Sequence, residues 1–165
     1  MRKYSYPIQV AALIGWLVLC YTASAVGALG SFQAQTFYGQ LVQPSWAPPP
    51  WLFGPVWTLL YTMMGVSVWM IWRRGGWSSN RFAIGSFCVQ LVVNALWSWV
   101  FFAWQLGGAA FVNIVLLWLL IALTIAVFWR ISKLAAVLLI PYLLWVSFAA
   151  ALNLSLWIAN PHILG

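Results

Sequence analysis

The chain has 165 residues, of which 65% are hydrophobic and 4% are charged, and it contains seven Lys or Arg, one His and no Asp or Glu. Soluble domains carry about 25% charged residues, so most of this surface is expected to face lipid. The lack of carboxylates excludes paired-acid hydrolases, Ser-His-Asp triads and acidic proton relays, and one His with two Cys offers no ordinary metal site.

Hydropathy predicts five apolar spans. They cover residues 8–30, 51–72, 82–104, 109–129 and 134–157. Each is about 20 residues or longer, enough to cross a hydrocarbon core about 30 Å thick. Because backbone groups in lipid must find partners within their own segment, the spans are expected to be helices. The predicted fold class is an all-α integral membrane protein, in which residues 1–165 form a single five-transmembrane-helix bundle with a long loop between helices 1 and 2.

The first span admits a second interpretation. Arg2 and Lys3, an apolar run and then Ala23-Ser24-Ala25 are typical of a cleaved signal peptide. The apolar run is long for such a signal, and the chain after it completes the same small bundle. We therefore favour a membrane helix over residues 8–30.

The longest connection, residues 31–50, is polar and aromatic and ends in a Pro-rich stretch. Four prolines lie within residues 44–50, and proline stops a helix and favours an extended, stiff path. Long loops in compact domains are often functional, so we expect this one to form a lid over one end of the bundle. Pro141 lies inside the last span and predicts a kink there.

The basic residues fall into three groups, all on one side of a five-span bundle. The groups are Arg2 with Lys3; Arg73, Arg74 and Arg81; and Arg130 with Lys133. The positive-inside rule then predicts a multi-pass protein with its N-terminus in and its C-terminus out. We interpret the net charge of +7 as the charge bias that orients a membrane protein, and no nucleic-acid partner is expected.

Three stripes inside the spans combine aromatic side chains with amides or small residues. They are Trp57 with Tyr61; Gln90, Asn94, Trp97 and Phe101; and Trp145, Ala149 and Asn153. Residues spaced by three or four share one helix face, and polar side chains within a span face the bundle. The pattern alone leaves two interpretations open: hydrogen-bonded contacts between helices, or a pocket for a flat apolar ligand.

Several motifs resemble those of the translocator protein family, also called the TspO/MBR family, tryptophan-rich sensory proteins or peripheral-type benzodiazepine receptors. Residues 38–49 read YGQLVQPSWAPP, followed by Phe53 and by VWTLLY at 56–61. NALWS at 94–98, with Phe101 and Phe102, is similar to the signature of the third helix, and PYLLWVSFA at 141–149, with Leu152 and Asn153, to that of the fifth. The similarity covers nearly the whole chain, in order.

This resemblance implies a five-helix membrane bundle, usually a homodimer, with a pocket at the end of the bundle that carries the first loop. The family binds porphyrins, haem, synthetic isoquinoline or benzodiazepine ligands and, in some members, cholesterol. No cofactor is required, and porphyrin or haem is the expected ligand. The ligand-binding positions it implies are Tyr38, Trp46, Pro48, Pro49, Trp57, Tyr61, Asn94, Trp97, Trp145, Ala149 and Asn153.

Trp57 and Trp145 also match tryptophans linked in bacterial relatives to light-dependent porphyrin breakdown. They would be catalytic only if such photo-degradation occurs. Indole can pass an electron to an excited porphyrin or react with oxygen species near it, so the reaction would need no carboxylate.

Two departures from the family pattern bear on the ligand. Gln43 stands where many relatives carry Lys, so the propionates of a porphyrin would lack a loop cation. The proposed cholesterol motif needs a basic residue after Tyr, whereas residues 154–158 contain neither. Three hypotheses follow: a tetrapyrrole-binding protein for sensing, transport or disposal, Trp-assisted photo-oxidation of a porphyrin, and an uncoupled sterol or lipid carrier. The short loops are typical of a bacterial membrane protein.

Overall fold

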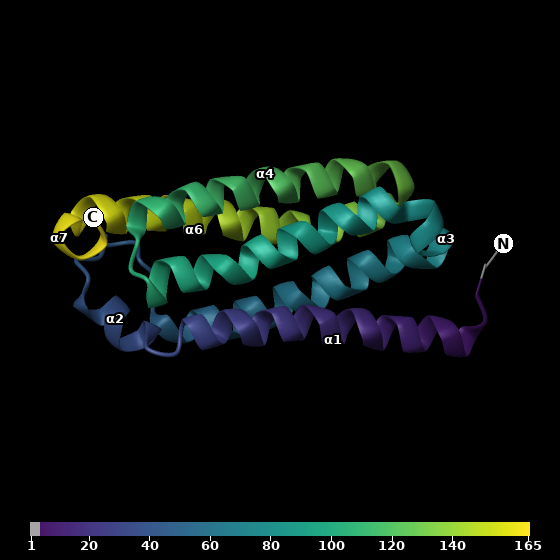
Figure 1. Cartoon of the computed structure of the whole chain (residues 1–165), viewed down its shortest axis with the longest axis horizontal. Helices are drawn as coiled ribbons and strands as arrows, with labels where there is room; N and C mark the ends of the chain where they lie inside the picture. The colour runs from purple at the N-terminus through teal and green to yellow at the C-terminus, as the bar shows by residue number, and fades with distance from the viewer. Residues whose placement is uncertain (1–3) are drawn as a thin grey trace.

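Helices account for all the regular secondary structure of residues 4–165, the part of the chain that the computed structural model describes. Arg2 and Lys3, which contribute to the expected orientation, lie outside the described residues. Four helical segments of the described part are long and apolar enough to cross a membrane: Tyr6–Gly30, Pro50–Ala103, Gly107–Ile131 and Lys133–Ala159. Figure 1 shows the long helices running side by side along the longest axis, with the two termini at opposite ends.

Helix α1 (Tyr6–Gly30) packs along α3 at close range. A Cβ added at Gly65 of α3 would lie 2.7 Å from the side chain of Leu17, so glycine allows the two helices to approach. The indole N–H of Trp69 also donates to the backbone oxygen of Gln9 at 2.9 Å. Small residues and side-chain hydrogen bonds of this kind are what hold helices together in lipid, where apolar burial contributes little.

Helix α3 (Phe53–Ser98) follows a short 3₁₀ turn, Pro50–Leu52, and continues into a π-helical turn, Trp99–Ala103. Its 46 residues are too long for one straight crossing of a core about 30 Å thick. The backbone leaves helical geometry at Gly76, with φ 70° and ψ −168°, and again at Asn80. The chain reverses direction there (Figure 1), so that residues 53–75, the first arm, lie beside residues 77–98, the second arm.

Helix α4 (Gly107–Ile131) is followed by α5 (Lys133–Leu138), α6 (Ile140–Ala159) and the short α7 (Pro161–Leu164). The kink expected at Pro141 is seen as the break between α5 and α6 at Leu139. Proline lacks the N–H that would continue the helical ladder. The start of α5 is capped by the Ser132 hydroxyl, which accepts from the backbone N–H of Ala135 at 3.4 Å.

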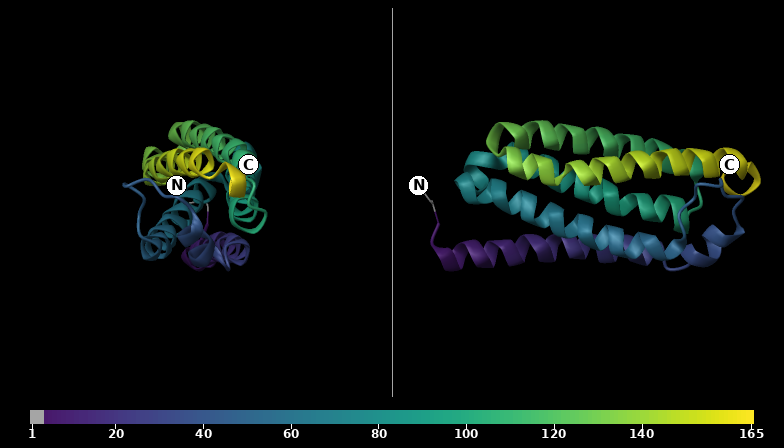
Figure 2. Two further views of the ribbon diagram at one scale, coloured as in Figure 1. Left: turned by 90° about the vertical axis from the view of Figure 1, so that its left-hand side faces the viewer. Right: turned by 180° about the vertical axis from the view of Figure 1, so that it is seen from behind.

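The connection between α1 and α3, residues 31–50, is here called the cap segment. Its Pro-rich end was expected to be extended, and no helix was expected before it, but residues Ala34–Gln40 form helix α2. The four glutamines of the connection suggested a loop, whereas Phe37, Tyr38 and Leu41 supply one apolar face that is buried in a cluster with residues of α6, α7 and the π-helical turn. Figure 2 shows the cap segment and α7 at the same end of the bundle.

A pair of hydrogen bonds fixes the cap segment to the end of α6. The Asn160 side chain accepts from the backbone N–H of Val42 at 2.7 Å and donates to the Val42 oxygen at 3.0 Å. Asn160 itself is buried. Because both backbone polar groups of Val42 are satisfied by a single side chain, the start of the Pro-rich part of the cap segment is held in one position.

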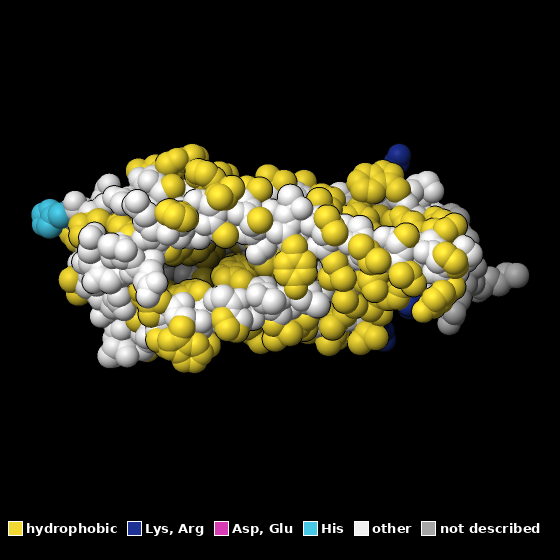
Figure 3. All heavy atoms as spheres, turned by 90° about the horizontal axis from the view of Figure 1, so that it is seen from below, with side chains coloured by type: hydrophobic (Ala, Val, Ile, Leu, Met, Phe, Trp, Pro, Cys, Tyr) yellow, Lys and Arg dark blue, Asp and Glu magenta, His cyan; other side chains and the backbone are white. Residues whose placement is uncertain are grey.

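The described basic side chains gather at the end opposite the cap. The Arg74 guanidinium donates to the backbone oxygen of Ile131, which joins the turn of α3 to the end of α4. Arg73 lies 4.8 Å above the Trp69 ring, a cation–π contact. Figure 3 shows Lys and Arg atoms at one end of the molecule and His162 at the other.

Gly76 is where substitution should disturb the fold most sharply. Its positive φ is disfavoured for other residues, and an added Cβ would collide with the Tyr4 hydroxyl. We expect Gly76→Ala to lower the free energy of unfolding by about 1–3 kcal/mol, measured by thermal unfolding in detergent. Gly85→Ala is the matched control, because a Cβ there meets nothing within 4 Å. Equal melting temperatures for the two variants would contradict this account of the turn.

Candidate functional site

A cavity of about 640 Å³ lies beneath the cap segment, between α1, α2, the two arms of α3 and α6. Seven of the eleven ligand-binding residues expected from the sequence line it: Tyr38, Trp57, Tyr61, Asn94, Trp97, Trp145 and Ala149. They come from four separate segments of the chain. The stripes seen in the sequence therefore converge on one space, and that space has the size of a small-molecule site.

The other four expected residues lie outside the cavity wall. The exposed Trp46 packs edge-on against Phe148, with ring centroids 5.7 Å apart. Pro48 is buried and Pro49 is exposed. Asn153 lies behind the wall, where its oxygen accepts from the Trp97 indole N–H at 3.1 Å and its amide donates to the Gly107 oxygen at 3.1 Å. Asn153 therefore orients the Trp97 ring and does not line the cavity itself.

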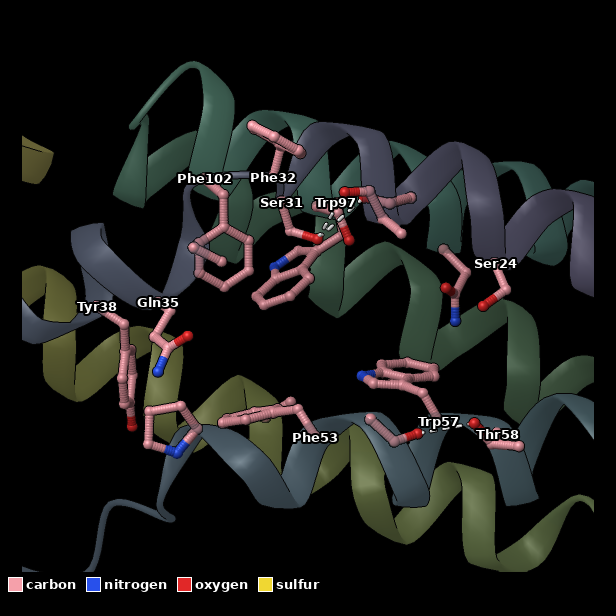
Figure 4. Close-up of a pocket in the computed structure, with 18 of the residues that line it drawn as sticks. Ser24, Ser31, Phe32, Gln35, Tyr38, Phe53, Trp57, Thr58, Trp97 and Phe102 are labelled. Carbon is pink, nitrogen blue, oxygen red and sulfur yellow. Dashed lines mark hydrogen bonds between the residues drawn. The ribbon is translucent and has the colours of Figure 1, made fainter.

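Aromatic rings form most of the cavity wall. Phe53 stands between Tyr38 and Trp145, with centroid distances of 6.0 and 5.9 Å and edge-to-face geometry. Trp57 packs on Tyr61 at 5.5 Å. Figure 4 shows the Trp57 and Trp97 rings facing the open space from opposite sides. Flat apolar faces around a narrow space suit a planar ligand held by stacking.

A buried chain of hydrogen bonds forms the floor of the cavity. The Tyr61 hydroxyl donates to Asn94 Oδ1 at 2.8 Å, and Asn94 Nδ2 donates to the Tyr142 hydroxyl at 2.6 Å. That hydroxyl donates in turn to Gln90 Oε1 at 2.8 Å. All four side chains are buried. The network joins the first arm of α3, its second arm and α6, and so sets the spacing of three walls.

One wall of the cavity comes from α1, none of whose residues is among the expected ligand-binding positions. Ser24, Gly27, Ala28 and Ser31 line the cavity at helical spacing and have small side chains that leave room beside the rings. A stripe of small residues at positions i, i+3, i+4 and i+7 was the available signal. Gln35 of α2 was also missed, because no helix was expected in this part of the connection. Figure 4 places its amide toward the open space.

The cavity opens on the side of the bundle. Ala28 of α1 and both Gly54 and Thr58 of α3 line the cavity and are exposed. Figure 3 shows the molecule hollowed on the face that it views, toward the end that carries His162. Further along the same two helices, the hydroxyls of Tyr21 and Thr62 are hydrogen-bonded at 2.6 Å. The opening thus lies between α1 and the first arm of α3.

The polar groups of the wall are neutral. None of the lining residues is Lys, Arg or His, and the chain has no acidic residue. Burial raises the pKa of the Tyr38 phenol, which therefore stays protonated at neutral pH. The Tyr38 hydroxyl and the Trp145 indole N–H are buried with no hydrogen-bond partner among residues 4–165. The site can therefore stack against a ligand and hydrogen-bond it through neutral groups.

A substitution at Tyr142 tests whether the hydrogen-bond network at the floor of the cavity stabilises the fold. Tyr142→Phe removes the hydroxyl that joins Asn94 to Gln90 and leaves both amides without that partner. We expect the free energy of unfolding to fall by about 1–2 kcal/mol, measured by thermal unfolding in detergent. Tyr21→Phe is the control, because its hydroxyl is exposed and its loss should cost only a few tenths of a kcal/mol. Equal effects of the two changes would argue against a special role for the buried network.

Comparison with known proteins places this architecture in a family. Residues 11–158 match the model of the TspO/MBR family. The chain is 45% identical to tryptophan-rich protein TspO of Chlorobaculum tepidum over 159 residues, which covers 93% of this chain and 98% of that protein. It is 40% identical to the translocator protein of Sus scrofa over 75% of each chain, and 32% identical to the tryptophan-rich sensory protein of Cereibacter sphaeroides over 87% of each. The chain belongs to the TspO/MBR family.

Proposed function

We propose that this membrane protein binds a porphyrin- or haem-type tetrapyrrole, or another flat aromatic ligand of the isoquinoline or benzodiazepine kind, in the cavity beneath the cap segment. Binding would serve the sensing, transport or disposal of the ligand. The observation that carries the proposal is the convergence of Trp57, Trp97 and Trp145 on one cavity of about 640 Å³. Stacking on these rings and burial of apolar surface would supply most of the affinity.

The arrangement in the membrane is part of the proposal. Segment Pro50–Ala103 would cross the bilayer twice, once in each arm of α3, to give five crossings in all. This is supported by its length of 54 residues and by the reversal at Gly76. The positive-inside rule would then place the end with Arg73, Arg74, Arg81, Arg130 and Lys133 on the cytoplasmic side, with the cavity toward the opposite side.

Titration with protoporphyrin IX in the dark tests the proposal. We expect saturable binding to the detergent-purified protein, with the midpoint raised about three- to tenfold in Trp145→Phe because part of the stacked surface is lost. Trp129→Phe is the control, because Trp129 is exposed on α4 and does not line the cavity. The protein has 14 Trp, so the midpoint of the quenching curve is the measurement, not its depth. Identical curves for the two variants, or curves that do not saturate, would mean partition into the micelle and would refute the proposal.

Light-dependent porphyrin breakdown is the second candidate function. It is favoured by one observation: Trp57 and Trp145 line the same cavity. Illumination of the saturated complex should then change the porphyrin absorption spectrum, and replacing both tryptophans by Phe should abolish the change while the protein stays saturated. An unchanged rate of bleaching in the double variant would leave binding as the only function of the site.

A further inference from the structure

The cavity contrasts with most binding sites for acidic ligands, because its polar groups are all uncharged. They include the Gln35 amide, the Trp57 indole N–H and the hydroxyls of Ser24 and Thr58, besides the amide and phenol of the floor. Figure 4 shows the Gln35 amide and the Trp57 nitrogen directed at the open space. These groups can bind carbonyl, ester or amide oxygens but cannot neutralise a negative charge.

The nearest cations along the chain are held elsewhere. Arg73, Arg74 and Lys133 lie at the far end of the bundle, where Arg74 is bound to the Ile131 oxygen and the other two lie over Trp rings. Gln43 is also turned away, because its amide donates to the Tyr38 oxygen and it does not line the cavity. No described side chain is therefore placed to pair with an anion in this space.

An ionised carboxylate that entered the cavity would lose hydration without gaining an opposite charge. Such a transfer is unfavourable, since the interior of a membrane bundle has a low dielectric constant. Neutral hydrogen-bond donors offset only part of that loss, whereas they satisfy an ester or amide oxygen fully. The free energy of binding is therefore more favourable for the uncharged form of any ligand whose side chains reach the wall.

We infer that the cavity selects uncharged planar ligands, so that a porphyrin ester or another neutral polycycle with oxygen acceptors binds more tightly than the corresponding dicarboxylate. This inference rests on the proposed function, because it assigns the class of ligand to the same cavity. Gln35 is the residue that sets this selectivity. It lies on the cap segment, lines the cavity with its amide toward the open space (Figure 4), and makes no side-chain hydrogen bond to the described residues.

Three porphyrins and three proteins test the inference. Protoporphyrin IX carries two carboxylates, its dimethyl ester carries none, and octaethylporphyrin has no oxygen at all. The proteins are the unaltered chain, Gln35→Lys and the control Gln40→Lys, in which an exposed α2 residue outside the cavity wall gains the same charge. Titrations are done at low ionic strength and at a pH well above about 4.3, so that the carboxylates are ionised and little screened.

The unaltered protein should bind the ester more tightly than the diacid, after correction for partition of each porphyrin into protein-free micelles. Gln35→Lys should shift the ester-to-diacid affinity ratio toward the diacid by about fivefold, the effect of one partly exposed ion pair. Gln40→Lys should leave the ratio within about twofold. The partition of each porphyrin into micelles is the same for every variant. It therefore cancels when the ester-to-diacid affinity ratios of two variants are compared.

Octaethylporphyrin separates failure of the inference from failure of the proposed function. Its affinity should be the same in all three proteins, which also shows that the variants are folded. If octaethylporphyrin binds saturably but the unaltered protein prefers the diacid, or if Gln35→Lys and Gln40→Lys shift the ratio equally, charge selection by the cavity is refuted and tetrapyrrole binding stands. Thr58→Lys, on the opposite wall, repeats the test independently of α2. If none of the porphyrins saturates, both proposals fall.

Discussion

The buried hydrogen-bond chain from Tyr61 through Asn94 and Tyr142 to Gln90 is the interaction on which the rest of the structure depends. In lipid, apolar side chains gain little by meeting one another, so polar contacts and close packing must hold helices in register. This network ties both arms of α3 to α6 directly below the cavity. The cavity therefore has a rigid floor, and its aromatic walls stand at fixed separations.

The cap segment closes the cavity at the end of the bundle, and the cavity opens at the side. Asn160 binds both polar groups of Val42, and the apolar face of α2 is buried, so the end of the bundle is closed. The exposed lining residues instead lie between α1 and the first arm of α3. A ligand that partitions into the bilayer would reach the cavity through this side opening. Uncharged planar molecules partition in this way, which agrees with the selectivity inferred for the cavity.

Helical periodicity placed Trp57 with Tyr61, and Trp145 with Ala149, on shared helix faces, because a residue's face on a helix depends only on spacing. The resemblance to a family then implied that these faces meet around one pocket. Spacing did not identify the small α1 residues that line the cavity, since Gly and Ser carry little hydropathy signal, or show that Asn153 acts by orienting Trp97. The helix at Ala34–Gln40 was missed because its stability comes from burial against α6 and α7, and such contacts are not local in sequence. The reversal falls in the gap between the spans expected at 51–72 and 82–104, but its dependence on one positive φ at Gly76, within a nearly continuous helix, did not follow from hydropathy.

The most direct test of the account is to fill the cavity without disturbing the fold. A Cβ added at Gly54 meets nothing within 4 Å, and Gly54 lines the opening, so Gly54→Phe should place a ring in the ligand's space. Gly15→Phe on α1 is the matched control, because Gly15 is equally open but outside the cavity. We predict that Gly54→Phe abolishes saturable octaethylporphyrin binding and that Gly15→Phe leaves its midpoint unchanged. Equal binding by both variants would show that the ligand site lies elsewhere.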